Sequence, residues 1–66
     1  MPGYDLTPRE VEILKLLSKG MRYKSIASAL YLSDGTVRNY ASALYLKLGV
    51  RNREEAIHKA LEAGIV

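Results

Sequence analysis

The chain has 66 residues, of which 48% are hydrophobic and 26% charged, and a formal net charge of +3. This is the composition of one small globular domain, and its length leaves no room for an enclosed substrate cavity with a catalytic shell. The absence of cysteine excludes disulfides and thiolate metal sites, and a single histidine provides no ligand cluster or acid–base pair. We therefore expect no enzyme, no cofactor and no metal site. The apolar runs are shorter than a membrane span, so we expect a cytoplasmic location without membrane contact.

Four segments show the signals of helices, and none shows the two-residue alternation of a strand. Thr7 and Glu10 are spaced as a capping box, with a proline between them at the first helical position. Ser33 and Asn52 are good N-cap residues for two later segments, and glycines stand just past the ends of three segments. The sequence therefore predicts an all-α domain over residues 6–66, with helices over residues 8–19, 23–30, 34–48 and 53–63 and a tail over residues 1–5.

The segment 34–48 carries the pattern most informative about function. Apolar residues recur along it at steps of three and four, which places them on one side of a helix that we expect to be buried. These residues are Val37, Tyr40, Ala41, Leu44 and Leu48. The opposite side carries Arg38, Asn39 and Ser42, and arginine and asparagine are the types that make bidentate contacts to guanine and adenine edges. A short turn before this segment completes a helix-turn-helix, whose second helix is expected in the major groove of double-stranded DNA.

Positive charge is concentrated in the middle of the chain, where residues 19–53 hold seven basic residues and one acidic residue. Such a block is expected of a protein that binds a polyanion, although solvated surfaces also carry basic residues. An alternative therefore stays open, in which the helix-turn-helix scaffold serves as a protein-interaction or oligomerisation module. Leu46, an apolar residue on the exposed side of the third predicted helix, would suit that alternative.

The last predicted helix is apolar over a broader arc than one buried side requires. Its small alanines permit close approach of a second helix, so we expect a weak homodimer through Ala56, Ala60 and Ala63. His58, the only histidine, is expected on the surface.

Several short motifs stand at fixed spacings along the chain. They are Leu6-Thr7-Pro8-Arg9-Glu10, Ile26-Ala27 with Leu30, Ser33 with Thr36-Val37-Arg38, and Lys47-Leu48-Gly49-Val50. With these motifs, the chain from residue 6 to residue 65 resembles the LuxR-type DNA-binding domains of bacterial transcription regulators. The resemblance implies the same four-helix fold, base reading by the third helix and a homodimer contact through the fourth. It also implies double-stranded DNA as the partner and, in a full regulator, RNA polymerase.

The resemblance also implies which residues touch DNA. It assigns base contacts to Arg38, Asn39 and Ser42, and phosphate contacts to Thr36 and to a second set of residues. That second set consists of Lys24 and Lys47, to which we add the Tyr40 hydroxyl. The family commonly has Ser-Asn-Lys-Glu where this chain has Arg22-Tyr23-Lys24-Ser25, so the phosphate contact of that asparagine is missing here. Since the family module commonly stands at the C-terminus of a longer regulator, we expect an excised domain, with Met1-Pro2-Gly3 as a boundary rather than a native start.

Overall fold

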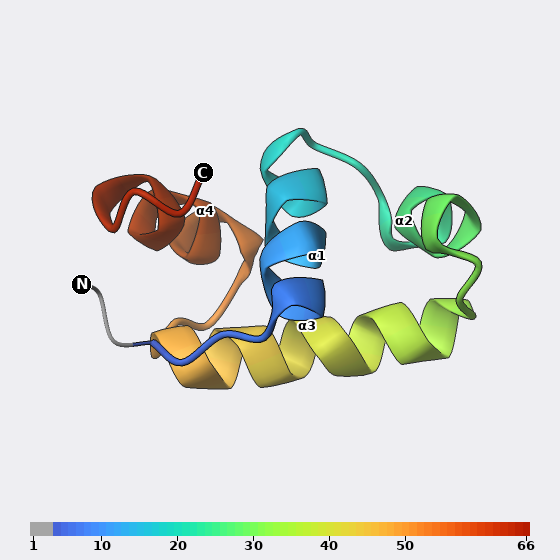
Figure 1. Cartoon of the computed structure of the whole chain (residues 1–66), viewed down its shortest axis with the longest axis horizontal. Coiled ribbons are helices and arrows are strands. Elements are labelled where there is room, and N and C mark those ends of the chain that lie inside the picture. Colours follow the sequence, from blue (N-terminus) through green and yellow to red (C-terminus); the bar gives the residue numbers. More distant parts are fainter. Residues whose placement is uncertain (1–3) are drawn as a thin grey trace.

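The structure, a computed structural model, describes residues 4–66, which form four helices joined by short turns and contain no strand (Figure 1). Helix α1 spans Pro8–Ser18, α2 spans Tyr23–Leu30, α3 spans Asp34–Leu48 and α4 spans Arg53–Glu62. The predicted all-α helix-turn-helix fold is confirmed, and each predicted helix matches the observed one to within one residue at either end. The expectation for residues 1–3 lies outside the described residues.

Side-chain caps explain where three of the helices begin. The Thr7 hydroxyl accepts a hydrogen bond from the Glu10 backbone N–H at 3.1 Å, and the Thr7 N–H donates to Glu10 Oε1 at 2.9 Å, which completes a capping box. Ser33 caps α3 through the N–H of Thr36 at 3.1 Å. Asn52 caps α4 through the N–H three residues on, at 2.9 Å. Each cap satisfies backbone donors that the first helical turn leaves without a partner.

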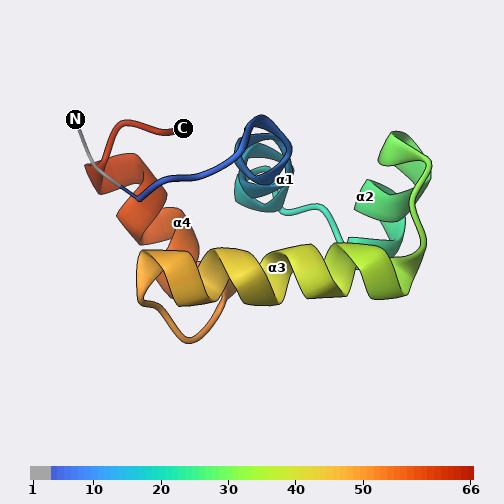
Figure 2. The same ribbon diagram turned by 60° about the horizontal axis from the view of Figure 1, so that its bottom comes forward.

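Helix α3 is the longest and packs against the other three (Figures 1 and 2). Helix α1 crosses it, α2 lies near its first turns and α4 lies near its last turns, so α3 is held along its whole length. The side of α3 that faces away from α1 is covered by no other helix of the described chain (Figure 2). No helix among the described residues is long and apolar enough to cross a membrane.

The core lies between these helices and is made of aliphatic side chains. Its largest fully buried members are Ile13, Leu14, Leu17, Ile26, Val37 and Leu44. Ala41 and Leu48 are buried too, as the periodicity of the segment predicts. Tyr40 corrects the prediction, because it is only half-buried at the edge of the core. A phenol carries a hydroxyl that needs water or a polar partner, so a tyrosine is less readily enclosed than a leucine.

Residues 4 and 5, which were predicted to belong to a tail, contact the domain. The partly buried Tyr4 packs against the core. The backbone carbonyl of Asp5 accepts a hydrogen bond from the Lys47 ammonium at 3.2 Å. These contacts extend the folded unit to the N-terminal side of Leu6.

The turn between α2 and α3 contains a residue in the left-handed region. Tyr31 ends α2 with φ 59° and ψ 41°, and 95% of its surface is exposed. The left-handed conformation lets the Leu32 N–H reach back to the Ala27 carbonyl oxygen at 2.8 Å, which closes the helix end. A residue with a Cβ is strained in this region, whereas glycine is not.

Replacement of Tyr31 by glycine is therefore expected to raise the free energy of unfolding by about 0.5–1 kcal/mol, after the greater flexibility of glycine in the unfolded chain is subtracted. Urea unfolding followed by circular dichroism measures this change. Tyr31→Ala is the matched control, because it removes the ring but keeps the Cβ. A glycine variant no more stable than the alanine variant would contradict the strain.

Candidate nucleic-acid interface

Three polar residues of α3 form a solvent-exposed strip. Arg38, Asn39 and Ser42 are all exposed, while Val37 and Ala41 of the same helix are buried. We call Arg38, Asn39 and Ser42 the reading strip. The burial pattern thus places the three residues predicted to contact bases where a ligand could reach all of them at once.

The first turn of α3 adds a pair of hydroxyls beside the reading strip. Ser33 Oγ and Thr36 Oγ1 lie 2.9 Å apart, so one hydroxyl donates to the other. The other hydroxyl hydrogen of the pair is left to donate to an acceptor outside the protein, such as a phosphate oxygen. The predicted contact from Thr36 is compatible with its role in the cap.

The first turn of α2 is open and basic. Arg22 occupies the N-cap position without making a side-chain cap hydrogen bond, unlike the cap residues of the other three helices. Lys24 stands in this turn with an exposed side chain. Uncapped backbone N–H groups and the positive end of the helix dipole favour an anion at this place.

A cluster around Tyr23 connects α2 to α3 and to the start of α4. The guanidinium carbons of Arg38 and Arg53 lie over the Tyr23 ring, 5.7 and 5.5 Å from its centroid. The hydroxyls of Tyr23 and Tyr45 lie 3.3 Å apart, and Arg53 Nη1 donates to the Met21 carbonyl oxygen at 2.6 Å. Burial and the hydrogen bond with Tyr23 raise the pKa of Tyr45 from 10.0 to about 12, so its hydroxyl stays protonated well into the alkaline range. We call this cluster the Tyr23 platform.

Sequence reasoning missed the Tyr23 platform, because its members are distant along the chain. The signal that was available is the departure at position 23, where the related pattern has asparagine and this chain has an aromatic residue.

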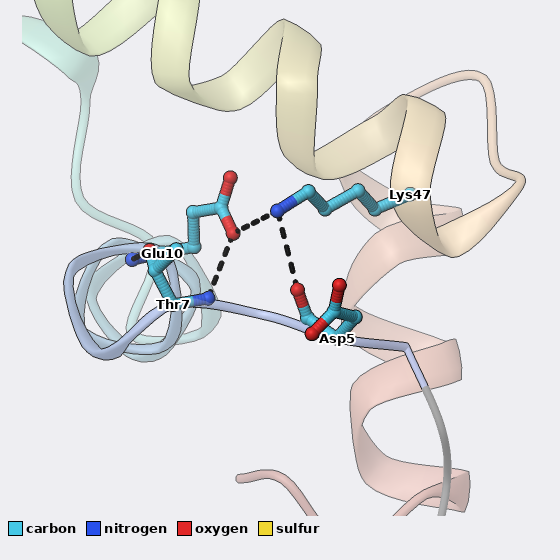
Figure 3. A network of polar contacts seen from close by, with 4 residues as sticks. All are labelled: Asp5, Thr7, Glu10 and Lys47. Carbon is cyan, nitrogen blue, oxygen red and sulfur yellow. Dashed lines mark hydrogen bonds and ion pairs between the residues drawn. The ribbon is translucent and has the colours of Figure 1, made fainter.

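Lys47, which was predicted to contact a phosphate, is directed toward α1 in the structure (Figure 3). Its ammonium donates to Glu10 Oε1 at 2.8 Å and to the Asp5 carbonyl oxygen at 3.2 Å. The hydrogen bond from Lys47, supported by those from Thr7, holds the pKa of Glu10 below its ordinary value of 4.5. Glu10 is 5% exposed and would be an unpaired buried carboxylate without this ammonium. The geometry therefore gives Lys47 an internal partner that sequence reasoning did not foresee.

Helix α4 requires a correction to the residues predicted for a dimer contact. Ala56 and Ala60 have no exposed surface, because they pack into the core of this chain and leave nothing for a second copy to touch. Ala63 is half-exposed, and the large apolar residue that α4 does expose is Leu61, at 61%. The surface position expected for His58 is confirmed.

Comparison with known proteins shows the family. The model of the bacterial regulatory proteins of the luxR family matches residues 4–60. The chain belongs to the luxR family of bacterial regulatory proteins. It is a LuxR-type DNA-binding domain of transcription regulators, which confirms the resemblance drawn from the sequence motifs.

Two relatives and two solved structures illustrate the similarity. The chain is 49% identical over 59 residues to the transcriptional regulatory protein DesR of Bacillus subtilis, and 52% identical over 59 residues to the uncharacterized transcriptional regulatory protein YvfU of the same organism. Each match covers 89% of this chain and 30% of the relative, so the chain spans about a third of the length of these proteins.

Two solved structures are similar to this chain in both fold and sequence. The transcription factor GerE superposes with a TM-score of 0.85 at 43% identity, over 91% of this chain and 90% of GerE. The response regulator ChrA of a heme-sensing two-component system superposes with a TM-score of 0.89 at 38% identity, over 92% of this chain and 30% of ChrA. The four-helix fold is therefore that of the solved LuxR-type domains.

The ion pair between Glu10 and Lys47 makes stability depend on pH in a defined direction. Because folding lowers the pKa of Glu10, its contribution to stability is complete above the ordinary value of 4.5 and is lost as the pH falls through the folded-state pKa. Glu10→Gln should lower the free energy of unfolding at about pH 7 by about 1–2 kcal/mol and flatten this acid dependence. Urea unfolding at several pH values measures both effects.

The control is Glu12→Gln, since Glu12 pairs with Arg9 at 3.2 Å on the surface, with 51% of its side chain exposed. It should change stability by less than about 0.5 kcal/mol. An acid dependence of the same steepness in Glu10→Gln and in the unmodified chain would show that the buried pair does not contribute.

Proposed function

We propose that the domain recognises specific sequences of double-stranded DNA by inserting α3 into the major groove, with the reading strip against base edges. The observation that carries this proposal is the exposure of Arg38, Asn39 and Ser42 on α3, whose Val37 and Ala41 are buried. Arg38 suits a guanine and Asn39 an adenine, while Ser42 bonds either base. A groove about 12 Å wide accepts a helix of this kind.

The phosphate backbone would be held on both sides of the reading strip. Lys24 and the uncapped N–H groups of α2 offer one set of contacts, and the hydroxyls of Thr36 and Tyr40 offer another. We assign Lys47 primarily to the internal pair with Glu10, because two of its three donors already have protein partners. Its remaining N–H is the part of the ammonium that a phosphate could still reach. Since bacterial DNA lies in the cytoplasm, the proposal places the domain there.

We further propose a weak homodimer on DNA, formed through the exposed part of α4 around Leu61 and Ala63. Two copies would then read paired half-sites about one helical turn apart. In a longer regulator, such a dimer would stand beside RNA polymerase. Leu61→Glu should abolish the dimer that sedimentation detects on DNA. The control is Arg9→Glu, a change of charge away from α4, which should leave the dimer intact. Equal dimer fractions in the two variants would contradict this interface.

Selection of bound duplexes from a random DNA pool, repeated at two salt concentrations, tests the function. The expected result is a motif with paired half-sites, which would also supply the operator. Binding without a motif would reduce the domain to a backbone-binding module. Absence of binding at low salt would favour the alternative, a protein-interaction module, for which Leu46 at 83% exposure provides the specific observation.

Two substitutions separate base contacts from phosphate contacts. Arg38→Ala should weaken binding to the selected duplex by about 1–3 kcal/mol and relax the preference at one base pair, because a bidentate base contact is lost. Lys24→Ala should weaken binding to all sequences alike and reduce the salt slope by about 1, because one phosphate contact is lost. Fluorescence anisotropy across a salt series measures both, and an Arg38→Ala variant with unchanged affinity and preference would show that α3 is not the reading helix.

A further inference from the structure

The guanidinium of Arg38 does not extend freely into solvent, although the residue is exposed. Its carbon lies over the Tyr23 ring of α2, 5.7 Å from the ring centroid. The face of an aromatic ring carries negative charge density, so a cation within about 6 Å is attracted to it. A residue of the first helix of the motif thus contacts the leading residue of the reading strip.

The ring that Arg38 contacts is itself held in place. The Tyr23 hydroxyl is hydrogen-bonded to the Tyr45 hydroxyl of α3 at 3.3 Å. Arg53 also lies over the ring and is fixed by its hydrogen bond to the Met21 carbonyl oxygen. The ring is half-buried, so its neighbours restrict its rotation more than water would. Arg38 therefore rests on a surface that α3 and α4 both fix.

We propose that Tyr23 is a positioning residue for base recognition, which orders the Arg38 guanidinium before DNA is bound. The inference rests on the proposed function, in which Arg38 reads a base. An arginine side chain loses rotamer freedom when it forms a bidentate contact, and an arginine already ordered loses less. Tyr23 would thereby affect affinity and discrimination at the base pair that Arg38 reads, without touching that base pair.

Two substitutions at position 23 distinguish this role from simple packing. Tyr23→Phe keeps the aromatic face and removes the hydroxyl, whereas Tyr23→Leu keeps an apolar side chain and removes the face. Two duplexes serve as probes. The first is the most enriched duplex of the selection described above. The second is altered at the base pair that Arg38 reads, which is the position where the Arg38→Ala variant loses its preference. Tyr23→Leu should bind the enriched duplex about two- to five-fold more weakly, the size of an exposed cation–π contact. Tyr23→Phe should keep most of the affinity.

A double-mutant cycle measures the coupling between Tyr23 and Arg38 in DNA affinity, which a simple packing defect at position 23 would not produce. In the Arg38→Ala background, Tyr23→Leu should cause almost no further loss, because the residue it positions is absent. The salt slope should stay constant in Tyr23→Leu, since no phosphate contact is removed. An equal loss from Tyr23→Leu with and without Arg38 would overturn the proposal.

A measurement without DNA tests the contact directly in the 66-residue chain. Nuclear Overhauser effects between the Arg38 side-chain protons and the Tyr23 ring protons should be present, and the Arg38 signals should carry ring-current shifts. The absence of both would overturn the proposal even if Tyr23→Leu failed to fold, because this experiment needs no variant.

The outcomes separate the inference from the function on which it rests. If Arg38→Ala loses its base preference while folded Tyr23→Leu binds as the unmodified chain does, base reading stands and the positioning role is overturned. If Arg38→Ala changes neither affinity nor preference, the role of α3 and the positioning role are both overturned. If magnetic resonance detects the contact between Arg38 and Tyr23 and the double-mutant cycle shows that the two residues are coupled, base reading by α3 and the positioning role of Tyr23 are both supported.

Discussion

The burial of one side of α3 is the constraint on which the rest of the structure depends. Val37, Ala41 and Leu44 are enclosed by the other helices, so α3 has one rotation about its axis and its polar residues can only face outward. The pair between Lys47 and Glu10 fixes the same helix at its far end, because it connects the last turn of α3 to the capping box of α1. One carboxylate thus serves both in the capping box of α1 and as the partner of a cation on α3. The small domain thereby holds the exposed side of α3 in a fixed orientation.

Most of this fold was predictable from the sequence, because the signals that define it are local. A capping box, N-cap residues and three- and four-residue apolar steps act within one or two helical turns, and they gave the helix bounds and the exposure of the reading strip. The same periodicity predicted a buried Tyr40, which the structure shows half-buried. The pattern treats the tyrosine ring as apolar and ignores the hydroxyl at its end.

What could not be predicted depends on contacts between distant residues. The internal partners of Lys47 lie 37 and 42 positions away, and the Tyr23 platform joins residues from three helices and one turn. The assignment of Ala56 and Ala60 to a dimer failed for a related reason. Periodicity shows that one side of α4 is apolar, but only the packing of α1 and α3 shows that this side is used within the chain. Sequence patterns identify faces, and tertiary structure determines what each face contacts.

Base reading by α3 can be tested by a magnetic resonance titration of the isotope-labelled chain with the duplex recovered by selection. If α3 enters the major groove, the largest changes in chemical shift will fall on the reading strip and on the first turn of α2, with small changes in the core. The contrary result would be changes concentrated on α4 around Leu61 with the reading strip unperturbed, which would move the binding surface to the opposite part of the domain and refute α3 as the reading helix.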